Sequence, residues 1–379
     1  MQRTGMVDDV SGQADGRSTR STRGRSWSQT VLGLVVAWVA LAGRKERRQS
    51  RPEASAVPNE LRRGLRAGRR AHSPTQIPPR GWWEVLKRVW DQVGRDNMSI
   101  VAAGCAFYAM LALFPAVTAL VSIYGLVADP AQVGQQVEAL RGYLPDQAVE
   151  LIGAQAQQVA SGGATVLGWS AAIAIVLALW TASSGVRTLF TALDIAYEEE
   201  ESRSLIGFYA TGLAFTLAAI LAVVIGLTVI IGVPTALSYL PLGPAAGWAV
   251  RIVSWLILLS LLILGLAMIY RFGPSRAPAN WRWLTPGAMV ASTLWLLASV
   301  AFSFYVANFD SYNETYGTLG GVIILLMWLY ISAFVILLGA ELNAELELQT
   351  ERDTTTGPTR PMGQRDAYVS DHTAETRRR

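Results

Sequence analysis

The most constraining feature of this sequence is a series of long runs that contain no charged residue. Asp96 and Asp129 are separated by 32 uncharged residues, and Arg203 and Arg251 by 47. A helix rises about 1.5 Å per residue and the bilayer core is about 30 Å thick, so about 20 apolar residues suffice to cross it. Soluble amphipathic helices do not contain such runs, which excludes a soluble enzyme.

Six of these runs are long enough to span a bilayer, and they predict an all-α integral membrane protein with six transmembrane helices. The charged residues are concentrated outside the runs, since residues 97–340 hold only 18 of the 60 in the chain. We expect the spans at Ser99–Ala128, Thr165–Val186, Ile206–Val233, Trp248–Tyr270, Thr285–Ala307 and Gly317–Ala340.

The distribution of Lys and Arg predicts the orientation of the chain. Basic residues close to a span are retained in the cytoplasm. With the N-terminus inside, 30 of the 32 Lys and Arg residues fall on the cytoplasmic side, and only Arg141 and Arg251 fall outside. The sequence therefore predicts a multi-pass membrane protein with cytoplasmic N- and C-termini.

The six spans are expected to form one membrane domain, 81–349, between two polar tails. Residues 1–80 and 350–379 have few apolar residues and many charged ones, a composition typical of disorder. The stretch 31–43 is apolar but short for a span, and is an interfacial helix, a spurious or translated-upstream segment or, as the least favoured alternative, a seventh span. The basic N-terminal tail is expected to contact anionic lipid headgroups.

Two further regions are expected to form amphipathic helices at the membrane interfaces. From Gly81 onward, tryptophan and aliphatic residues recur near helical spacing between charged residues, which is typical of a helix lying in the headgroup region. The outer connection 129–164 begins with Asp129-Pro130, a good helix start, and has apolar residues near one face. It is expected to form two helices.

Ionisable residues near span ends are the first functional candidates, because an unpaired charge in hydrocarbon is costly. Arg187 is expected to close the second span and Glu341 the sixth, with Asn343 and Glu345 directly after it. An ion pair between Arg187 and Glu341 is the predicted contact. It would either fix the packing of the bundle or take part in gating or substrate binding.

The outer hairpin between the last two spans gathers amide, carboxylate and phenol groups. Such residues suit a tight turn whatever the function, yet they are more numerous than a turn requires. They are candidates for contact with a substrate or ion: Asn308, Asp310, Tyr312, Asn313 and Tyr316.

Pro115 lies in the middle of the first span, where it removes a backbone hydrogen bond and kinks the helix. Tyr108 is two turns earlier on roughly the same face. The two residues either shape a cavity or serve helix packing.

Residues for catalysis or for a bound metal are not recognisable in the sequence. Both histidines, His72 and His372, lie in the polar tails, and the single Cys105 is inside the first span. The acidic run Glu198–Glu201 lacks the spacing of a cation site and is expected to be solvated. We therefore expect no catalytic residues, no cofactor, no metal and no specific nucleic-acid partner.

Several separated motifs appear in the membrane domain. They are AAGCAFYA (102–109) followed by LFP (113–115), WTASSGVR (180–187), YRFGP (270–274), and residues 303–317 leading into LGAELNAE (338–345). In this order they resemble the YihY/BrkB family of bacterial inner-membrane proteins over about residues 81–349. The resemblance implies a six-helix protein of the bacterial plasma (inner) membrane. The family's older label, ribonuclease BN, is not supported by a core without histidine.

The leading functional hypothesis is a transport-type protein that moves or positions an amphipathic lipid or envelope precursor between leaflets. The alternative is a membrane scaffold that recruits envelope partners, and a membrane-associated ribonuclease is a distant third. The expected partners are membrane lipids, with a second copy of the chain or envelope proteins as further candidates.

Overall fold

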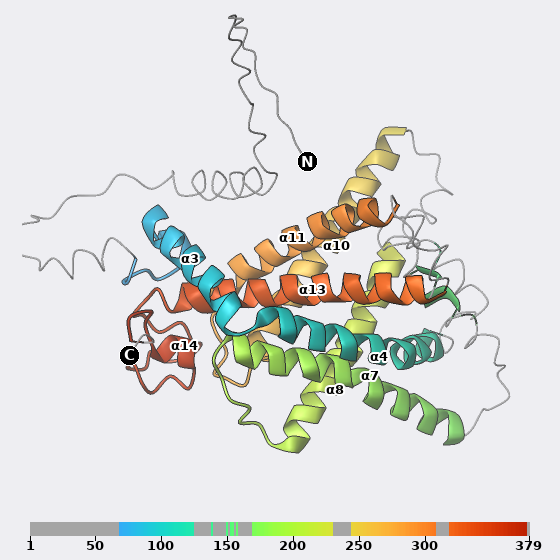
Figure 1. Cartoon of the computed structure of the whole chain (residues 1–379), viewed down its shortest axis with the longest axis horizontal. Helices are drawn as coiled ribbons and strands as arrows, with labels where there is room; N and C mark the ends of the chain where they lie inside the picture. Colours follow the sequence, from blue (N-terminus) through green and yellow to red (C-terminus); the bar gives the residue numbers. More distant parts are fainter. Residues whose placement is uncertain are drawn as a thin grey trace, which may run out of the picture. The chain divides into compact units, whose positions relative to one another are not determined.

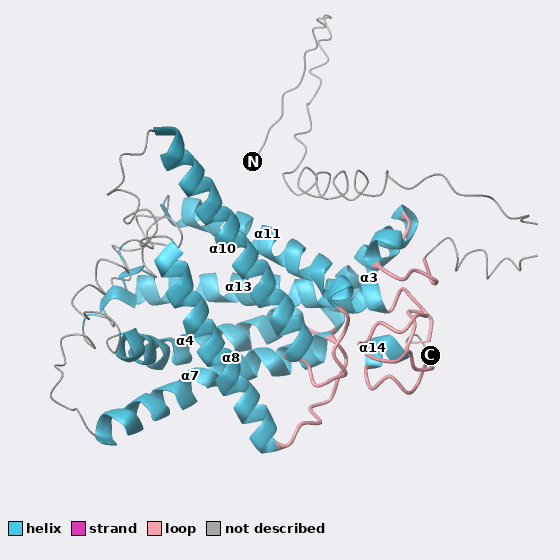
Figure 2. Cartoon of the chain, turned by 180° about the vertical axis from the view of Figure 1, so that it is seen from behind, coloured by secondary structure: helices cyan, strands magenta, loops and turns pink. Residues whose placement is uncertain are grey.

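The structure of the protein is a computed structural model, which describes residues 68–124, 138, 149–150, 152–154, 157, 169–229, 244–307 and 318–376. These residues form helices joined by loops, as Figure 2 shows, and their one β-bridge pairs Ala279 with Thr355. The helices are η1 (Pro74–Gln76), α3 (Pro79–Arg95), α4 (Met98–Tyr124), α7 (Trp169–Ala196), α8 (Leu205–Leu227), α10 (Pro244–Phe272), α11 (Trp281–Ala307), α13 (Thr318–Glu347) and α14 (Tyr368–Asp371).

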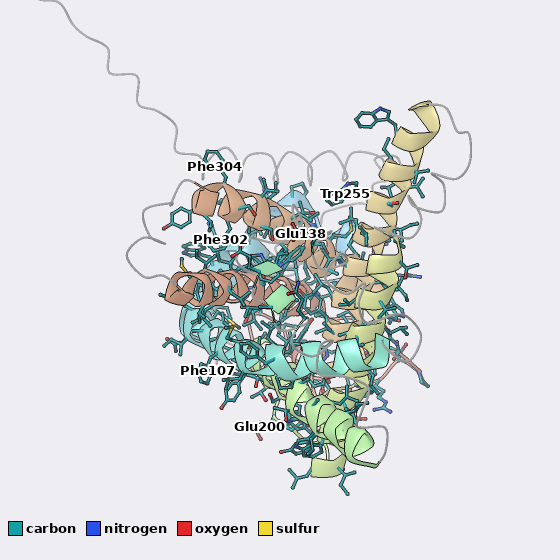
Figure 3. All side chains as sticks on the ribbon, turned by 90° about the vertical axis from the view of Figure 1, so that its right-hand side faces the viewer. Phe107, Glu138, Glu200, Trp255, Phe302 and Phe304 are labelled. Atoms are coloured by element: carbon teal, nitrogen blue, oxygen red, sulfur yellow. The ribbon has the colours of Figure 1, made fainter. Side chains whose placement is uncertain are left out.

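Six of these helices are long and apolar enough to cross a membrane, which confirms the predicted all-α membrane fold. They are α4, α7, α8, α10, α11 and α13. Large apolar side chains also project from their outer faces, among them Phe107, Trp255 and Phe304 in Figure 3. A surface of this kind is stable in lipid and unstable in water.

Helix α13 lies at the centre of the bundle. It packs against α11 on one side and against α4 and α7 on the other, while α8 packs on α7 and α10 on α11 (Figure 1). Glycine permits two of these close approaches. A Cβ atom at Gly339 of α13 would lie 2.8 Å from the Gly287 carbonyl oxygen of α11, and one at Gly185 of α7 would lie 3.4 Å from the Ala109 Cα atom of α4.

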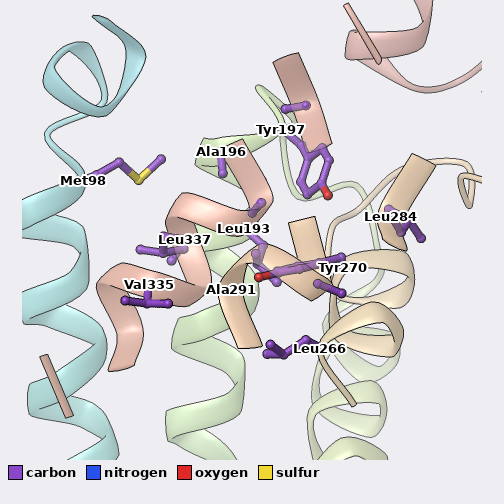
Figure 4. Packing of buried hydrophobic residues seen from close by; sticks show 14 of the residues in the cluster. Met98, Leu193, Ala196, Tyr197, Leu266, Tyr270, Leu284, Ala291, Val335 and Leu337 are labelled. Atoms are coloured by element: carbon purple, nitrogen blue, oxygen red, sulfur yellow. The ribbon is translucent and has the colours of Figure 1, made fainter. Parts of the chain in front are cut away.

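The buried core is concentrated at the end of the bundle that carries α3, which we call the α3 end. Side chains of α7, α10, α11 and α13 interlock there, including Leu193, Tyr197, Tyr270, Leu284 and Leu337 (Figure 4). The hydroxyl of Tyr270 donates to the Ile336 carbonyl oxygen at 2.7 Å, so this buried phenol is satisfied. Helices α7, α10, α11 and α13 are thus fixed together at the α3 end.

The amphipathic helix expected from Gly81 is present as α3. Its buried face, with Val85 and Val89, packs on Leu342 and Leu346 of α13, while Trp90 is 78% exposed on the opposite side. The two helices expected within 129–164, the apolar stretch 31–43 and most of the N-terminal tail lie outside the described residues.

The expectation of a disordered C-terminal tail, residues 350–379, is wrong for its described part, residues 350–376. This segment packs on the α3 end, with Thr354 and Ser370 buried, and its few apolar residues include the buried Val369. Hydrogen bonding orders it, because the buried Arg365 guanidinium donates to three backbone carbonyl groups. Composition, on which the expectation rested, does not reveal such bonds. The described residues 68–78 likewise pack on this end through Ala71 and Ile77.

Candidate functional site

A lateral groove with a volume of about 500 Å³ opens between α4, α7 and the start of α8. We call it the α4–α7 groove. Its walls are partly exposed, since Tyr108 is 46% and Ile195 39% accessible. The lining residues are Val101, Cys105 and Tyr108 of α4, Ser184, Arg187, Thr188, Thr191, Ala192 and Ile195 of α7, and Phe208 of α8.

Arg187 is the charged residue of this groove. It does not close α7 as expected, because the helix continues to Ala196 and leaves Arg187 well inside a candidate span. Its guanidinium carbon lies 4.4 Å from the ring centre of Tyr209 and 5.5 Å from that of Trp180, and the group donates to the Ser183 hydroxyl. Aromatic faces stabilise a cation without neutralising it.

A glycine of α8 makes room for the Arg187 side chain. The Arg187 stem passes over Gly212, where a Cβ atom would lie 2.6 Å from the Arg187 Cγ atom. Trp180 and Tyr209 stack on each other with ring centres 4.8 Å apart, which fixes the aromatic wall beside the guanidinium. Helices α7 and α8 therefore hold Arg187 in one position.

The predicted ion pair between Arg187 and Glu341 is wrong. Arg187 is turned toward α8, whereas Glu341 faces Asp96 at the corner between α3 and α4. Within the described part of the chain, Arg187 has aromatic and hydroxyl partners and no carboxylate partner. The prediction failed because it assumed that both residues end their helices, and α7 and α13 both continue beyond them.

Glu345 forms a buried ion pair with α3. The Arg88 Nε atom lies 2.5 Å from the Glu345 carboxylate, and the Arg88 Nη2 atom donates to Gln349 Oε1 at 2.6 Å. Breaking one partner of a buried pair leaves an uncompensated charge and costs about 3–5 kcal/mol. Glu345 therefore fixes α3 against α13, which is a structural role.

Glu347, which the sequence did not single out, forms a second buried ion pair. Arg276, in the loop after α10, donates to both of its carboxylate oxygens at 2.8 and 2.9 Å, and the Thr354 hydroxyl donates at 2.6 Å. Burial lowers the pKa of Arg276, but the adjacent Glu347 outweighs it, and the net shift is upward. The pair links α13, the α10–α11 loop and the C-terminal segment.

Asn343 bonds the backbone of α11 on both sides of a proline. Pro286 itself has no N–H group, and the neighbouring Gly287 N–H donates to Asn343 Oδ1 at 2.8 Å. The Asn343 Nδ2 atom donates in turn to the Leu284 carbonyl oxygen at 3.1 Å. Asn343 is therefore explained by helix packing.

The remaining predicted residues separate into two groups. Tyr108 lines the α4–α7 groove together with Arg187, whereas Pro115 lies inside α4 and is not among the lining residues. The outer hairpin candidates lie outside the described residues: Asn308, Asp310, Tyr312, Asn313 and Tyr316.

The acidic run after α7 is only partly solvated, contrary to expectation. Glu199 accepts a hydrogen bond from the Tyr368 backbone N–H at 2.7 Å and so ties this loop to α14. Burial raises the pKa of Glu199 to about 7. Glu201 binds Arg203, whose guanidinium lowers the pKa of that carboxyl.

Sequence reasoning missed the aromatic partners of Arg187. Trp180 and Ser183 lie seven and four residues before it, so all three share a face of α7, and this spacing could have identified them. Tyr209 and Gly212 belong to the next helix, and only the packing of α7 on α8 brings them to Arg187.

A family comparison covers both the groove and the α3 end. Residues 89–363, well over half of the chain, match the family described as Virulence factor BrkB. The chain belongs to the BrkB family. The matched range includes every helix from α4 to α13 and the first part of the C-terminal segment.

Individual relatives of this BrkB-family chain are bacterial proteins. YfkH of Bacillus subtilis (strain 168), whose name calls it ribonuclease-like, is 29% identical over 275 residues, which are 69% of this chain and 94% of YfkH. A UPF0761 membrane protein of Pseudoalteromonas atlantica is 27% identical over 67% of this chain and 83% of its own length. No solved structure matches the chain.

Proposed function

We propose that the protein moves or positions an amphipathic, anionic lipid or envelope precursor in the membrane, with the α4–α7 groove as its binding site. The observation that carries this proposal is Arg187, a cation inside a candidate span that lines an open groove and contacts aromatic rings rather than a carboxylate. An intramembrane cation without a counter-ion attracts an anionic ligand, and a guanidinium matches phosphate or carboxylate geometry.

The other groove residues fit a lipid that lies with its headgroup at Arg187. Ser184, Thr188 and Thr191 supply hydroxyl groups on the same helix. The exposed apolar side chains of Leu111 and Phe114 continue along α4 beyond Tyr108, where acyl chains would lie. A groove that opens laterally admits a lipid from the bilayer without a passage through water.

The proposal includes the orientation of the chain in the membrane and the lipids that contact its N-terminal tail. We place both termini in the cytoplasm, because that arrangement puts 30 of 32 Lys and Arg residues on the cytoplasmic side, and the basic N-terminal tail against anionic headgroups. We place the protein in the plasma (inner) membrane of a bacterium, because its relatives are bacterial proteins.

The test is lipid transfer between leaflets of reconstituted vesicles. Full-length protein is inserted into liposomes that carry a fluorescent anionic or zwitterionic phospholipid, and transfer is compared with empty vesicles. We expect protein-dependent transfer that favours the anionic lipid and falls in Arg187→Gln. If vesicles with protein transfer no more lipid than empty vesicles for several headgroups, the transport proposal is contradicted and a scaffold is favoured.

Two glycine variants provide a matched pair for this assay. Gly212→Ala places a Cβ atom 2.6 Å from the Arg187 Cγ atom and must displace the guanidinium, whereas a Cβ atom at Gly104 meets nothing within 4 Å. We therefore expect reduced transfer in Gly212→Ala and unchanged transfer in Gly104→Ala. Equal transfer in the two variants would contradict a role for the Arg187 position.

A further inference from the structure

Glu341 is a carboxyl group buried without a cation. Its accessible surface is 0%, and among the described residues neither of its carboxylate oxygens has a well-formed hydrogen bond. Burying an ionised carboxylate without a partner costs many kcal/mol, so such a group takes up a proton or binds a cation instead. This carboxyl group is separate from the α4–α7 groove and is not used by the proposed function.

The charged groups that act on Glu341 are acidic. Asp96, at the end of α3, faces it closely enough for a hydrogen bond, and Glu345 lies one turn further along α13. The cations of α3 do not neutralise Glu341, because Arg88 is bound to Glu345 and Gln349 and the charge of Arg95 acts on Glu345. Directly after α7, the phenol of Tyr197 is a titratable neighbour of Glu341. Glu198 of the same loop accepts from the Gln92 amide at 3.4 Å, and Gln92 also donates to Asp96.

The hydrogen bonds of Asp96 indicate which of the two carboxyl groups, Asp96 or Glu341, carries the proton. The Gln92 Nε2 atom donates to both Asp96 oxygens at 2.8 Å, so Asp96 is held as an acceptor. A hydrogen bond between two carboxyl groups requires a proton on one of them. Glu341, which is buried and lacks any amide donor, is the member that carries it.

We propose that Asp96 and Glu341 form a proton-binding site, in which Glu341 holds one proton and Asp96 is the carboxylate that accepts it in a hydrogen bond. Two carboxyl groups that face each other cannot both ionise easily and share a single proton. Uptake converts the Glu341 carboxylate to a carboxylic acid with one proton from water and needs no other reactant.

The position of the site couples the proton to helix packing. Asp96 lies at the corner between α3 and α4, where Asn97 has a φ of 49°, and Glu341 lies on the central helix α13. Loss of the proton places two negative charges where this corner meets α13, and their repulsion opposes the packing that Arg88 and Glu345 maintain one turn away.

Labelling with dicyclohexylcarbodiimide tests the proposal, since this reagent adds to protonated carboxyl groups in apolar surroundings. Full-length protein in detergent is labelled near neutral pH, and the modified residues are located by mass spectrometry. Glu345 and Glu347 are internal controls, because both are buried on the same helix and each forms an ion pair with an arginine. We expect Glu341 to be labelled at least about tenfold more than either. Equal labelling, or preference for Glu345 or Glu347, overturns the proposal.

Two aspartate variants test whether the proton is shared. Asp96→Asn replaces the acceptor with an amide that can donate to the Glu341 carboxylate and favours its ionised form, so labelling of Glu341 at neutral pH should fall several-fold. Asp91→Asn removes one charge from an exposed position of the same helix and should leave labelling unchanged. Unchanged labelling in Asp96→Asn overturns the shared site. Protection of Glu341 by sodium but not by choline overturns the assignment to a proton in favour of a metal cation.

Discussion

Asn343→Ala is the substitution whose effect on stability follows most directly from the structure. The side chain accepts from the Gly287 N–H group and donates to the Leu284 carbonyl oxygen, and both groups are buried beside Pro286 of α11. Alanine removes both hydrogen bonds. A buried hydrogen bond contributes about 0.5–1.5 kcal/mol, so the loss of two should cost about 1–3 kcal/mol.

The assay is thermal unfolding of the purified protein in detergent, followed by tryptophan fluorescence. At about 2 °C per kcal/mol for a chain of this size, the Tm should fall by at least about 2 °C. Thr293→Ala is the matched control, since it removes a hydroxyl from the exposed face of α11 that bonds only the Met289 carbonyl oxygen. Its effect should stay within about 0.5 kcal/mol. A decrease for Asn343→Ala no larger than that of the control would refute the reasoning.

Three further predictions concern the α3 end. Arg276→Ala leaves Glu347 buried and unpaired and should cost about 3–5 kcal/mol in thermal unfolding, part of which Arg276→Ala/Glu347→Gln restores. The pKa of Glu199 is raised from 4.5 to about 7, so the stability that its protonated form contributes is lost as the pH rises through 7. The decrease in Tm from about pH 5 to pH 8 should therefore be smaller in Glu199→Gln than in the unmodified protein. Deletion of the chain after residue 350 removes Thr354 and Tyr368 from their partners and should lower the Tm, and an unchanged value would contradict the packing of this segment.

The sequence was sufficient to predict the membrane fold. Charge-free runs reveal spans because hydrocarbon excludes charge, and each of the six runs became a helix of sufficient length. The predicted ends were wrong where polar residues continue a helix beyond its apolar part. Helix α7 continues to Ala196 and α13 to Glu347. In those last turns Asp194 accepts from the Ser275 N–H, and Glu345 and Glu347 pair with arginines.

The candidate site was only partly predictable. Arg187 was identified as an ionisable residue near a span end and Tyr108 as a residue on the same face as Pro115, and Arg187 and Tyr108 do line one groove. The contact of Arg187 with Tyr209 depends on how α7 packs on α8, for which no local pattern exists. The order in residues 350–376 was unpredictable for a similar reason, since it depends on hydrogen bonds between segments distant in sequence, such as Tyr368 with Glu199.

Photo-cross-linking tests most directly the central claim that an anionic lipid binds in the α4–α7 groove. The full-length protein is reconstituted with an anionic phospholipid that carries a photoreactive acyl chain, and the cross-linked peptides are mapped by mass spectrometry. We predict cross-links in residues 101–108 and 184–195, reduced in Arg187→Gln. Residues 252–264 of α10 are also apolar and exposed to lipid, and they serve as the internal reference. Cross-links as frequent in α10 as in the groove, and unchanged in Arg187→Gln, would contradict the claim.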